Sequence, residues 1–195
     1  GLPISRFIVA SNRNDILARF LTANDMSARP VEPSLSPSMD IQVSSNFERL
    51  LFELLGRDAA ATARTMRDFR ATGRMPIPDA SWRAASAEFT GFALDDDATL
   101  AEIARWNREA GYLADPHTVI GLAAARAHAP ADAGIPVITA ATAHPAKFPD
   151  AVERATGLRP PLPPALADLY EREECLTVLP NDLAAAQAFV RQHAL

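Results

Sequence analysis

The sequence predicts an α/β protein that contributes to a doubly wound, mostly parallel sheet with many flanking helices. Two observations carry this prediction. Three short apolar runs, at 5–11, 136–142 and 176–179, have the composition of strands, and a helical pattern follows each of them. Strands that alternate with helices form parallel sheets, because a parallel connection needs a long crossover that is usually helical.

The amino-terminal segment gives the clearest strand-to-helix unit. Residues 5–11 are rich in β-branched and aromatic side chains, as in a buried strand. Asn14 and Asp15 then offer an N-cap to a helix whose apolar side chains share one face. Residues 30–44 hold several prolines and serines and are expected to form an irregular loop. Loops of this length in compact domains are often functional.

A helical stretch is expected over about 45–95, and further helices follow it. Capping boxes at Ser45–Glu48 and Thr99–Glu102 open two of the helices. Asp115 and Pro116 open another, as an N-cap followed by proline at the first helical position. The helices are expected at 45–56, 58–72, about 82–89, 99–111, 115–128, after His144-Pro145, after the Pro-rich elbow at 160–164, and from Asn181-Asp182 through Phe189.

Composition excludes several classes of function. The 195 residues carry a net charge of −5 without a basic run, so a nucleic-acid partner is not expected. The longest apolar stretches reach only about ten residues, which is short of a membrane span. A single cysteine, Cys175, and no recognisable signal peptide favour a cytoplasmic location. No spacing of metal ligands is present, so no metal site is expected.

Polar residues follow two of the predicted strands, at Ser11–Asp15 and at Thr142–Pro145. Ligands of open parallel sheets bind beyond the carboxyl ends of the strands, and helix N-termini favour anions. For any one of these residues, however, capping a helix is the commoner role. His117 has the pattern of a partly exposed residue in the first turn of a helix, more than that of a general base. Cys175 follows two glutamates, which would raise a thiol pKa, so it is a poor nucleophile.

Lys147 is the only lysine among the 19 basic residues. Its position in the first turn after the second predicted strand would let it contact a phosphate or carboxylate at that helix end. The alternative is an ordinary solvated surface lysine.

Four ordered segments, 7–15, 35–41, 111–117 and 142–148, resemble the carboxyl-terminal part of threonine synthases. The segments read FIVASNRND, LSPSMDI, GYLADPH and TAHPAKF, and the resemblance extends essentially from end to end. It implies a pyridoxal-phosphate enzyme of the tryptophan-synthase-β-like fold, which converts O-phospho-L-homoserine and water to L-threonine and phosphate. Residues 1–195 would then be a carboxyl-terminal α/β portion of that enzyme.

The resemblance also implies roles for particular residues. Thr142 matches the position of the neutral hydroxyl that meets the pyridine nitrogen of the cofactor. Asn12, Arg13, Ser38 and Lys147 lie in the matched segments and have chemistry suited to the substrate and its phosphate.

No catalytic residue is expected in this chain, because the Schiff-base lysine and the Gly-rich loop for the cofactor phosphate would lie upstream of Gly1. The missing amino-terminal half is therefore an implied partner, and the chain alone is expected to be inactive. The alternative is a non-catalytic α/β binding module that has lost the cofactor lysine.

Overall fold

Two parallel strands lie at the centre of the larger part of the chain. In the computed structural model, which describes residues 2–132 and 134–194, β1 (Phe7–Ser11) pairs with β2 (Phe89–Ala93). The register places Phe7 opposite Phe89 and Ser11 opposite Ala93. The described residues form two compact units, one up to Pro161 and one from Leu162 onwards, and each is described by itself.

Helices account for most of the remaining structure. The larger unit contains α1 (Ile16–Ala23), η1 (Pro37–Met39), α2 (Phe47–Leu54), α3 (Ala59–Thr72), α4 (Asp79–Glu88), α5 (Asp96–Ala110), α6 (Pro116–Ala127), η2 (Pro145–Lys147) and α7 (Pro149–Thr156). The smaller unit contains η3 (Pro164–Leu166), η4 (Leu169–Glu171) and α8 (Leu183–His193). No helix within the described residues has both the length and the apolar character to cross a membrane.

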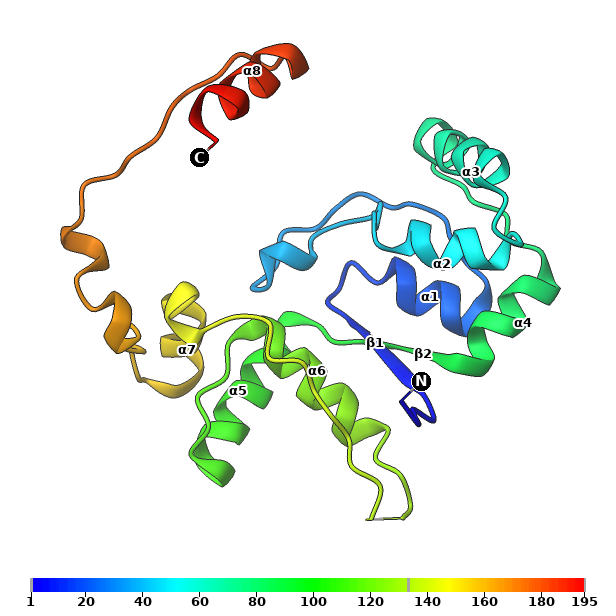
Figure 1. Ribbon diagram of the computed structural model, residues 1–195. Helices are drawn as coiled ribbons and strands as arrows, with labels where there is room; N and C mark the ends of the chain where they lie inside the picture. The colour runs from blue at the N-terminus through cyan, green and yellow to red at the C-terminus, as the bar shows by residue number, and fades with distance from the viewer. Residues whose placement is uncertain (1, 133, 195) are drawn as a thin grey trace. The chain divides into compact units, whose positions relative to one another are not determined.

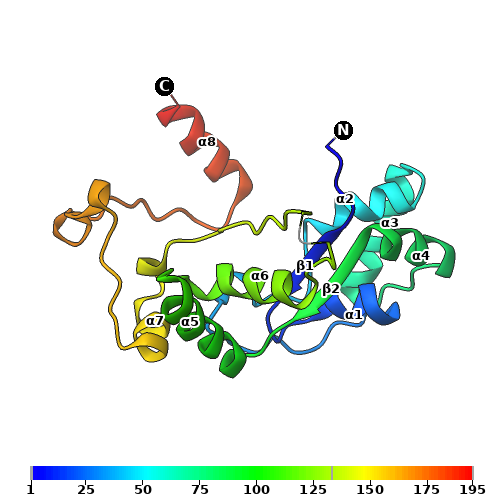
Figure 2. The same ribbon diagram turned by 90° about the horizontal axis from the view of Figure 1, so that it is seen from below.

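Helices cover both faces of the strand pair (Figures 1 and 2). α1 lies on one face and α6 on the other. The approach of α1 is unusually close, since a Cβ added to Gly91 would lie 2.7 Å from both the Cα and the carbonyl oxygen of Ala18. Glycine is therefore required at this point of β2, because the obstacle is backbone, which cannot rotate away.

Two hydrophobic clusters hold the larger unit together. The first gathers side chains from α1, α2, α3 and the residues before α4, with Phe20 and Leu51 fully buried and Phe69 2% exposed. The second packs α5 against α6 and α7, and Ile103 and Val119 lie at its centre. Burying each of these large side chains contributes about 1.5–3 kcal/mol, so the helices are fixed by packing and not by propensity alone.

The structure confirms several sequence predictions. The strand at the amino terminus is followed by α1, and α3 ends at Gly73, whose φ of 67° gives it the left-handed conformation. Asp115 caps α6 through its side chain, and Asp182 caps α8 in the same way.

The predicted strand at 136–142 is wrong for the described chain. The segment is irregular in the structure, and Ile138 is 91% exposed. A strand forms only where a neighbour satisfies its backbone groups, and no described segment pairs with this one. The composition of the segment thus indicates a strand, but composition does not supply the neighbouring strand that would be needed.

The predicted strand at 176–179 is wrong for the same reason. It belongs to the smaller unit, where Leu176 and Val178 are 72% and 86% exposed. It also forms no ladder with any described segment.

Two other predictions need correction. The helix expected at about 82–89 ends at Glu88, and β2 begins at the next residue, a strand that the sequence pattern did not indicate. The helix expected from Thr99 begins at Asp96 instead. Its N-cap is Asp95, which accepts the Ala98 N–H, and Thr99 is buried within the helix.

A small polar cluster links the end of α1 to the following turn. Asp25 accepts hydrogen bonds from the N–H and the hydroxyl of Ser27, at 3.0 and 2.5 Å, and it forms an ion pair with Arg19. The Ser27 hydroxyl and the Arg19 guanidinium outweigh burial and lower the pKa of Asp25 from 3.8 to about 2. The carboxylate therefore favours the folded state in its ionised form.

The lowered pKa predicts a pH-dependent effect of Asp25→Asn. The wild-type carboxylate contributes stability above its unfolded pKa of 3.8, and this contribution is lost as the pH falls through the folded value of about 2. The variant is expected to unfold at a lower temperature than the wild type at about pH 6, with the difference shrinking below about pH 3. Thermal unfolding across this range checks it, with Glu174→Gln as the control for loss of one surface charge. A difference that stays constant with pH would contradict the prediction.

Candidate functional site

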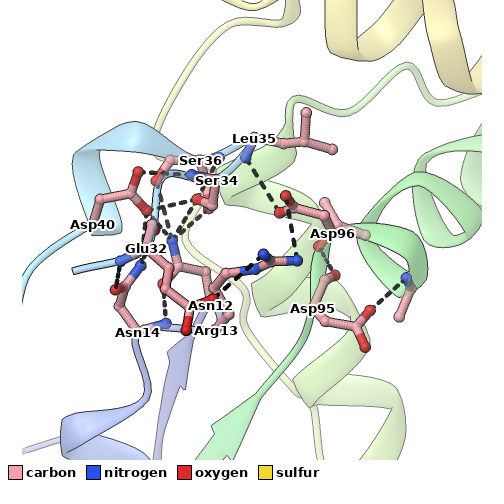
Figure 3. A network of polar contacts seen from close by, with 12 residues as sticks. Asn12, Arg13, Asn14, Glu32, Ser34, Leu35, Ser36, Asp40, Asp95 and Asp96 are labelled. Carbon is pink, nitrogen blue, oxygen red and sulfur yellow. Dashed lines mark hydrogen bonds and ion pairs between the residues drawn. The ribbon is translucent and has the colours of Figure 1, made fainter. Parts of the chain in front are cut away.

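A network of buried amides and hydroxyls lies just beyond the carboxyl end of β1 (Figure 3). Asn12 is 1% exposed, and its amide donates to the Ser34 hydroxyl at 2.7 Å, the Ser36 hydroxyl at 3.0 Å and the Asp40 carboxylate at 2.7 Å. Its oxygen accepts the Asn14 N–H at 2.8 Å. Asn12 thus joins the end of the strand to the irregular loop that the sequence predicted at 30–44.

Asp40 is the acceptor at the centre of this network. Its carboxylate also receives the Asn14 amide at 3.0 Å, and the N–H and hydroxyl of Ser34 at 2.9 and 2.6 Å. Asn14 makes a second link, since its side chain exchanges two hydrogen bonds with the backbone of Glu32. Loop residues 32–40 are therefore fixed to the strand end, although the loop contains only one short turn of regular structure.

Arg13 points away from this buried network toward the surface. Its guanidinium lies 3.6 Å from the Glu32 carboxylate and 3.7 Å from that of Asp96, and its side chain is 36% exposed. These long, partly solvated pairs are weak, so an incoming anion can compete for the same guanidinium.

The N-terminus of α6 forms a second polar centre. Asp115 is buried, and one carboxylate oxygen accepts the N–H groups of His117 and Thr118 at 2.8 and 3.3 Å. The Thr118 hydroxyl accepts the Thr142 N–H at 3.2 Å. Thr142 itself is exposed, and its hydroxyl makes no hydrogen bond within residues 2–132 and 134–194.

His117 connects this helix end to the loop that contains Ser38. Its Nδ1 lies 3.1 Å from the Asp115 carboxylate, and its Nε2 accepts the Ser38 N–H at 3.4 Å. The ring packs against Phe148 at 4.4 Å between centroids. His117 is 9% exposed, so the expectation of a partly exposed histidine is wrong.

Lys147 lies in the short helical turn η2, which His144 caps by accepting the Ala146 N–H at 3.1 Å. The ammonium is exposed and lies 5.9 Å from the centre of the Phe148 ring. It forms no ion pair with any described carboxylate. Lys147 and His117 therefore contact the same aromatic ring, which places η2 beside the start of α6.

The predicted site residues thus fall into two groups. Asn12 is buried and fully bonded, whereas Arg13, Ser38, Thr142 and Lys147 are exposed. Sequence reasoning missed Asp40 and the Asp115–His117 pair. The signals for them were weak. Asp40 was an aspartate within a long irregular loop, and His117 was a histidine two residues after a predicted helix cap.

This arrangement defines an α/β protein whose exposed hydroxyls and cations gather around a parallel strand end and a helix N-terminus. Residues 118–190 match the family model described as "Threonine synthase, C-terminal". The threonine synthase of Pseudomonas aeruginosa is 53% identical over 194 residues, a match that covers 99% of this chain and 41% of the relative.

Solved structures agree with the sequence comparison. The PLP-bound threonine synthase of Brucella melitensis matches with a TM-score of 0.85 and 46% identity, covering all of this chain and 41% of that one. Yeast threonine synthase matches with a TM-score of 0.80 and 30% identity, covering 98% of this chain and 42% of that one. The chain corresponds to the carboxyl-terminal portion of threonine synthases and spans about two-fifths of the length of these relatives. The comparisons do not favour a non-catalytic module.

Proposed function

We propose that this chain is the carboxyl-terminal portion of a cytoplasmic, pyridoxal-phosphate-dependent threonine synthase. The reaction is the conversion of O-phospho-L-homoserine and water to L-threonine and phosphate, the final chemistry of threonine biosynthesis. The observation that carries the proposal is the end-to-end similarity to a threonine synthase whose structure contains PLP. The portion of the enzyme that this chain does not cover supplies the Schiff-base lysine.

The residues present fit the pyridine end of this cofactor. When bound, the cofactor supplies an electron sink for carbanions formed at the substrate. Thr142 offers it an exposed hydroxyl, and the hydrogen bond from its N–H to Thr118 fixes the backbone that carries this hydroxyl. A neutral hydroxyl leaves the ring nitrogen largely unprotonated, whereas a carboxylate would hold it charged. The carboxylate at this helix end is that of Asp115, which accepts the His117 N–H as the cap of α6 and also contacts the His117 ring. In this proposal it is therefore not the partner of the ring nitrogen.

Three exposed side chains are suited to the phosphate of the substrate. Arg13 and Lys147 supply cations and Ser38 a hydroxyl, the groups that bind dianionic phosphate most strongly. Asn12 contributes indirectly, because its amide is consumed in fixing the loop that carries Ser38. In this proposal Asn12 therefore sets the shape of the substrate site without touching the phosphate.

The exposed segment at 136–142 fits a role at the junction with the missing portion of the enzyme. Val137 and Ile138 are 42% and 91% exposed, although their neighbours are apolar or hydroxyl-bearing and suited to a strand. A strand contributed by the amino-terminal portion would satisfy the backbone of this segment and bury these side chains. Thr142, at the end of the segment, would then be held by Thr118 on one side and by the added strand on the other.

The first test uses the full-length protein that carries this chain. Incubation with O-phospho-L-homoserine is expected to release phosphate and L-threonine in equal amounts. Reduction with borohydride, followed by denatured mass measurement, is expected to show one covalently trapped cofactor. A protein that lacks both the adduct and the activity would instead support the binding-module alternative.

A substitution at Thr142 tests the residue assigned to the cofactor. In the full-length enzyme, Thr142→Ala is expected to weaken cofactor binding or slow turnover about fivefold, because one hydrogen bond of about 1 kcal/mol is lost. Cofactor absorbance and steady-state rates measure both effects. Thr142→Ser keeps the hydroxyl and is the matched control, with values near those of the wild type. Unchanged occupancy and rate in Thr142→Ala would overturn the assignment.

A further inference from the structure

His117 has three contacts that together fix the tautomer and the orientation of its ring. Since the Ser38 N–H donates to Nε2, that nitrogen carries a lone pair. The ring proton is then on Nδ1, from which it is donated to the Asp115 carboxylate at 3.1 Å. The Phe148 ring covers the imidazole and limits its rotation.

Asp115 holds the ring in this orientation. Burial alone would raise the pKa of Asp115, but the hydrogen bonds from His117 and Thr118 together hold it below its ordinary value. Its carboxylate therefore remains an acceptor for the Nδ1 proton while it caps α6. This pairing orients the histidine and leaves Nε2 directed at the loop.

Ser38 lies at the tip of the loop, between Ser36 and Asp40, which the network around Asn12 holds. It belongs to η1, a turn of only three residues that begins with proline, and the first N–H groups of such a turn have no partner within it. His117 supplies the acceptor for the Ser38 N–H from a segment far away in the sequence. The network around Asn12 fixes the base of the loop, at Ser34, Ser36 and Asp40. His117 fixes its exposed tip.

We infer that His117 is a positioning residue, which in its neutral Nδ1–H form holds the loop at Ser38 against the N-terminus of α6. The inference rests on the proposed function. The same helix end carries Thr118, which holds the backbone of Thr142. His117 thereby keeps the hydroxyl proposed for the substrate phosphate at a fixed spacing from the hydroxyl proposed for the cofactor. Because His117 holds the loop at Ser38 and makes no hydrogen bond to Thr142, its loss is expected to affect substrate binding and not cofactor binding.

Two substitutions in the full-length holoenzyme separate the contacts of His117. Asparagine places an amide near the position of Nδ1, so His117→Asn keeps the link to Asp115 but is too short to reach Ser38. Glutamine is longer, and in His117→Gln its carbonyl oxygen can take the place of Nε2 and accept the Ser38 N–H. We expect His117→Asn to raise the KM for O-phospho-L-homoserine about fivefold to tenfold, the equivalent of one lost hydrogen bond. Cofactor occupancy should be unchanged, and His117→Gln should restore most of the affinity.

The outcomes distinguish this inference from the proposed function. A wild-type enzyme that does not act on O-phospho-L-homoserine refutes the proposed function. An active wild-type enzyme whose KM is unaffected by His117→Asn, or equally impaired by both substitutions, refutes only the positioning role. A merely structural role would lower folded yield and cofactor occupancy together without rescue by glutamine.

A measurement on the wild type covers the case in which the variants do not fold. Nitrogen-15 NMR of the histidine-labelled holoenzyme reports the tautomer of His117, assigned through its contact with Phe148. The Nδ1–H tautomer is expected, and the Nε2–H tautomer would overturn the inference because such a nitrogen cannot accept the Ser38 N–H.

Discussion

Gly91→Ala is expected to destabilise the full-length protein by about 3 kcal/mol, at the upper end of the usual range for overpacking. The added methyl group would lie 2.7 Å from the Cα and the carbonyl oxygen of Ala18, so α1 and β2 would have to separate. Because α1 also contributes Ile16 and Phe20 to the first hydrophobic cluster, its displacement would disturb packing well beyond the strand. The midpoint of urea denaturation measures the effect.

Gly121→Ala is the matched control for this substitution. Its added methyl group would meet only the Thr139 side-chain methyl, at 2.9 Å, so one side chain and no backbone would have to shift. The gain in helix propensity within α6, about 1 kcal/mol, is expected to offset that adjustment. If Gly91→Ala were no more destabilising than Gly121→Ala, the close approach of α1 to β2 would be refuted.

Asn12→Asp is expected to cost about 3–5 kcal/mol at neutral pH, because it creates an uncompensated charge in a buried network. The substitution replaces the amide that donates to Asp40 at 2.7 Å with a second carboxylate. Two carboxylates at this separation repel each other, and protonation of one of them relieves the repulsion. The loss of stability is therefore expected to shrink as the pH is lowered toward about 5, which denaturation at both pH values would detect.

Asn46→Asp makes the same chemical change at an exposed site and is the control for Asn12→Asp. Asn46 lies at the N-terminus of α2, where a negative charge is favourable by a few tenths of a kcal/mol. The stability of the Asn46→Asp variant is therefore expected to be close to that of the wild type. An equal effect of the two substitutions would show that the network around Asp40 does not hold the loop at 32–40.

Local sequence signals predicted the first strand, α1 and most of the later helices. These elements depend on apolar periodicity and on caps such as Asp115, which neighbouring residues determine. The strand β2 escaped prediction because it is short, contains glycine and follows α4 without a breaker. The strand expected at 136–142 is irregular because composition records suitability for a sheet but not the presence of a neighbour.

In the candidate site, too, local features could be predicted from the sequence and long-range contacts could not. The polar residues after β1 could be recognised from their position beyond a strand, and the structure places Asn12 and Asn14 together in one network. The contacts of Asp40 with Asn12 and of His117 with Ser38 could not be foreseen, because each joins residues distant in the sequence. Such contacts depend on tertiary packing, which no local pattern specifies.

The pairing of β1 with β2 also has a consequence for synthesis of the protein. The two strands are neighbours in the sheet, yet all of α1 to α4 separates them in the chain. At about 5–20 residues added per second, β1 is complete roughly 4–16 seconds before the end of β2 has been translated. During that interval β1 has been made but cannot pair with β2, so the sheet cannot close until α1 to α4 have also been synthesised.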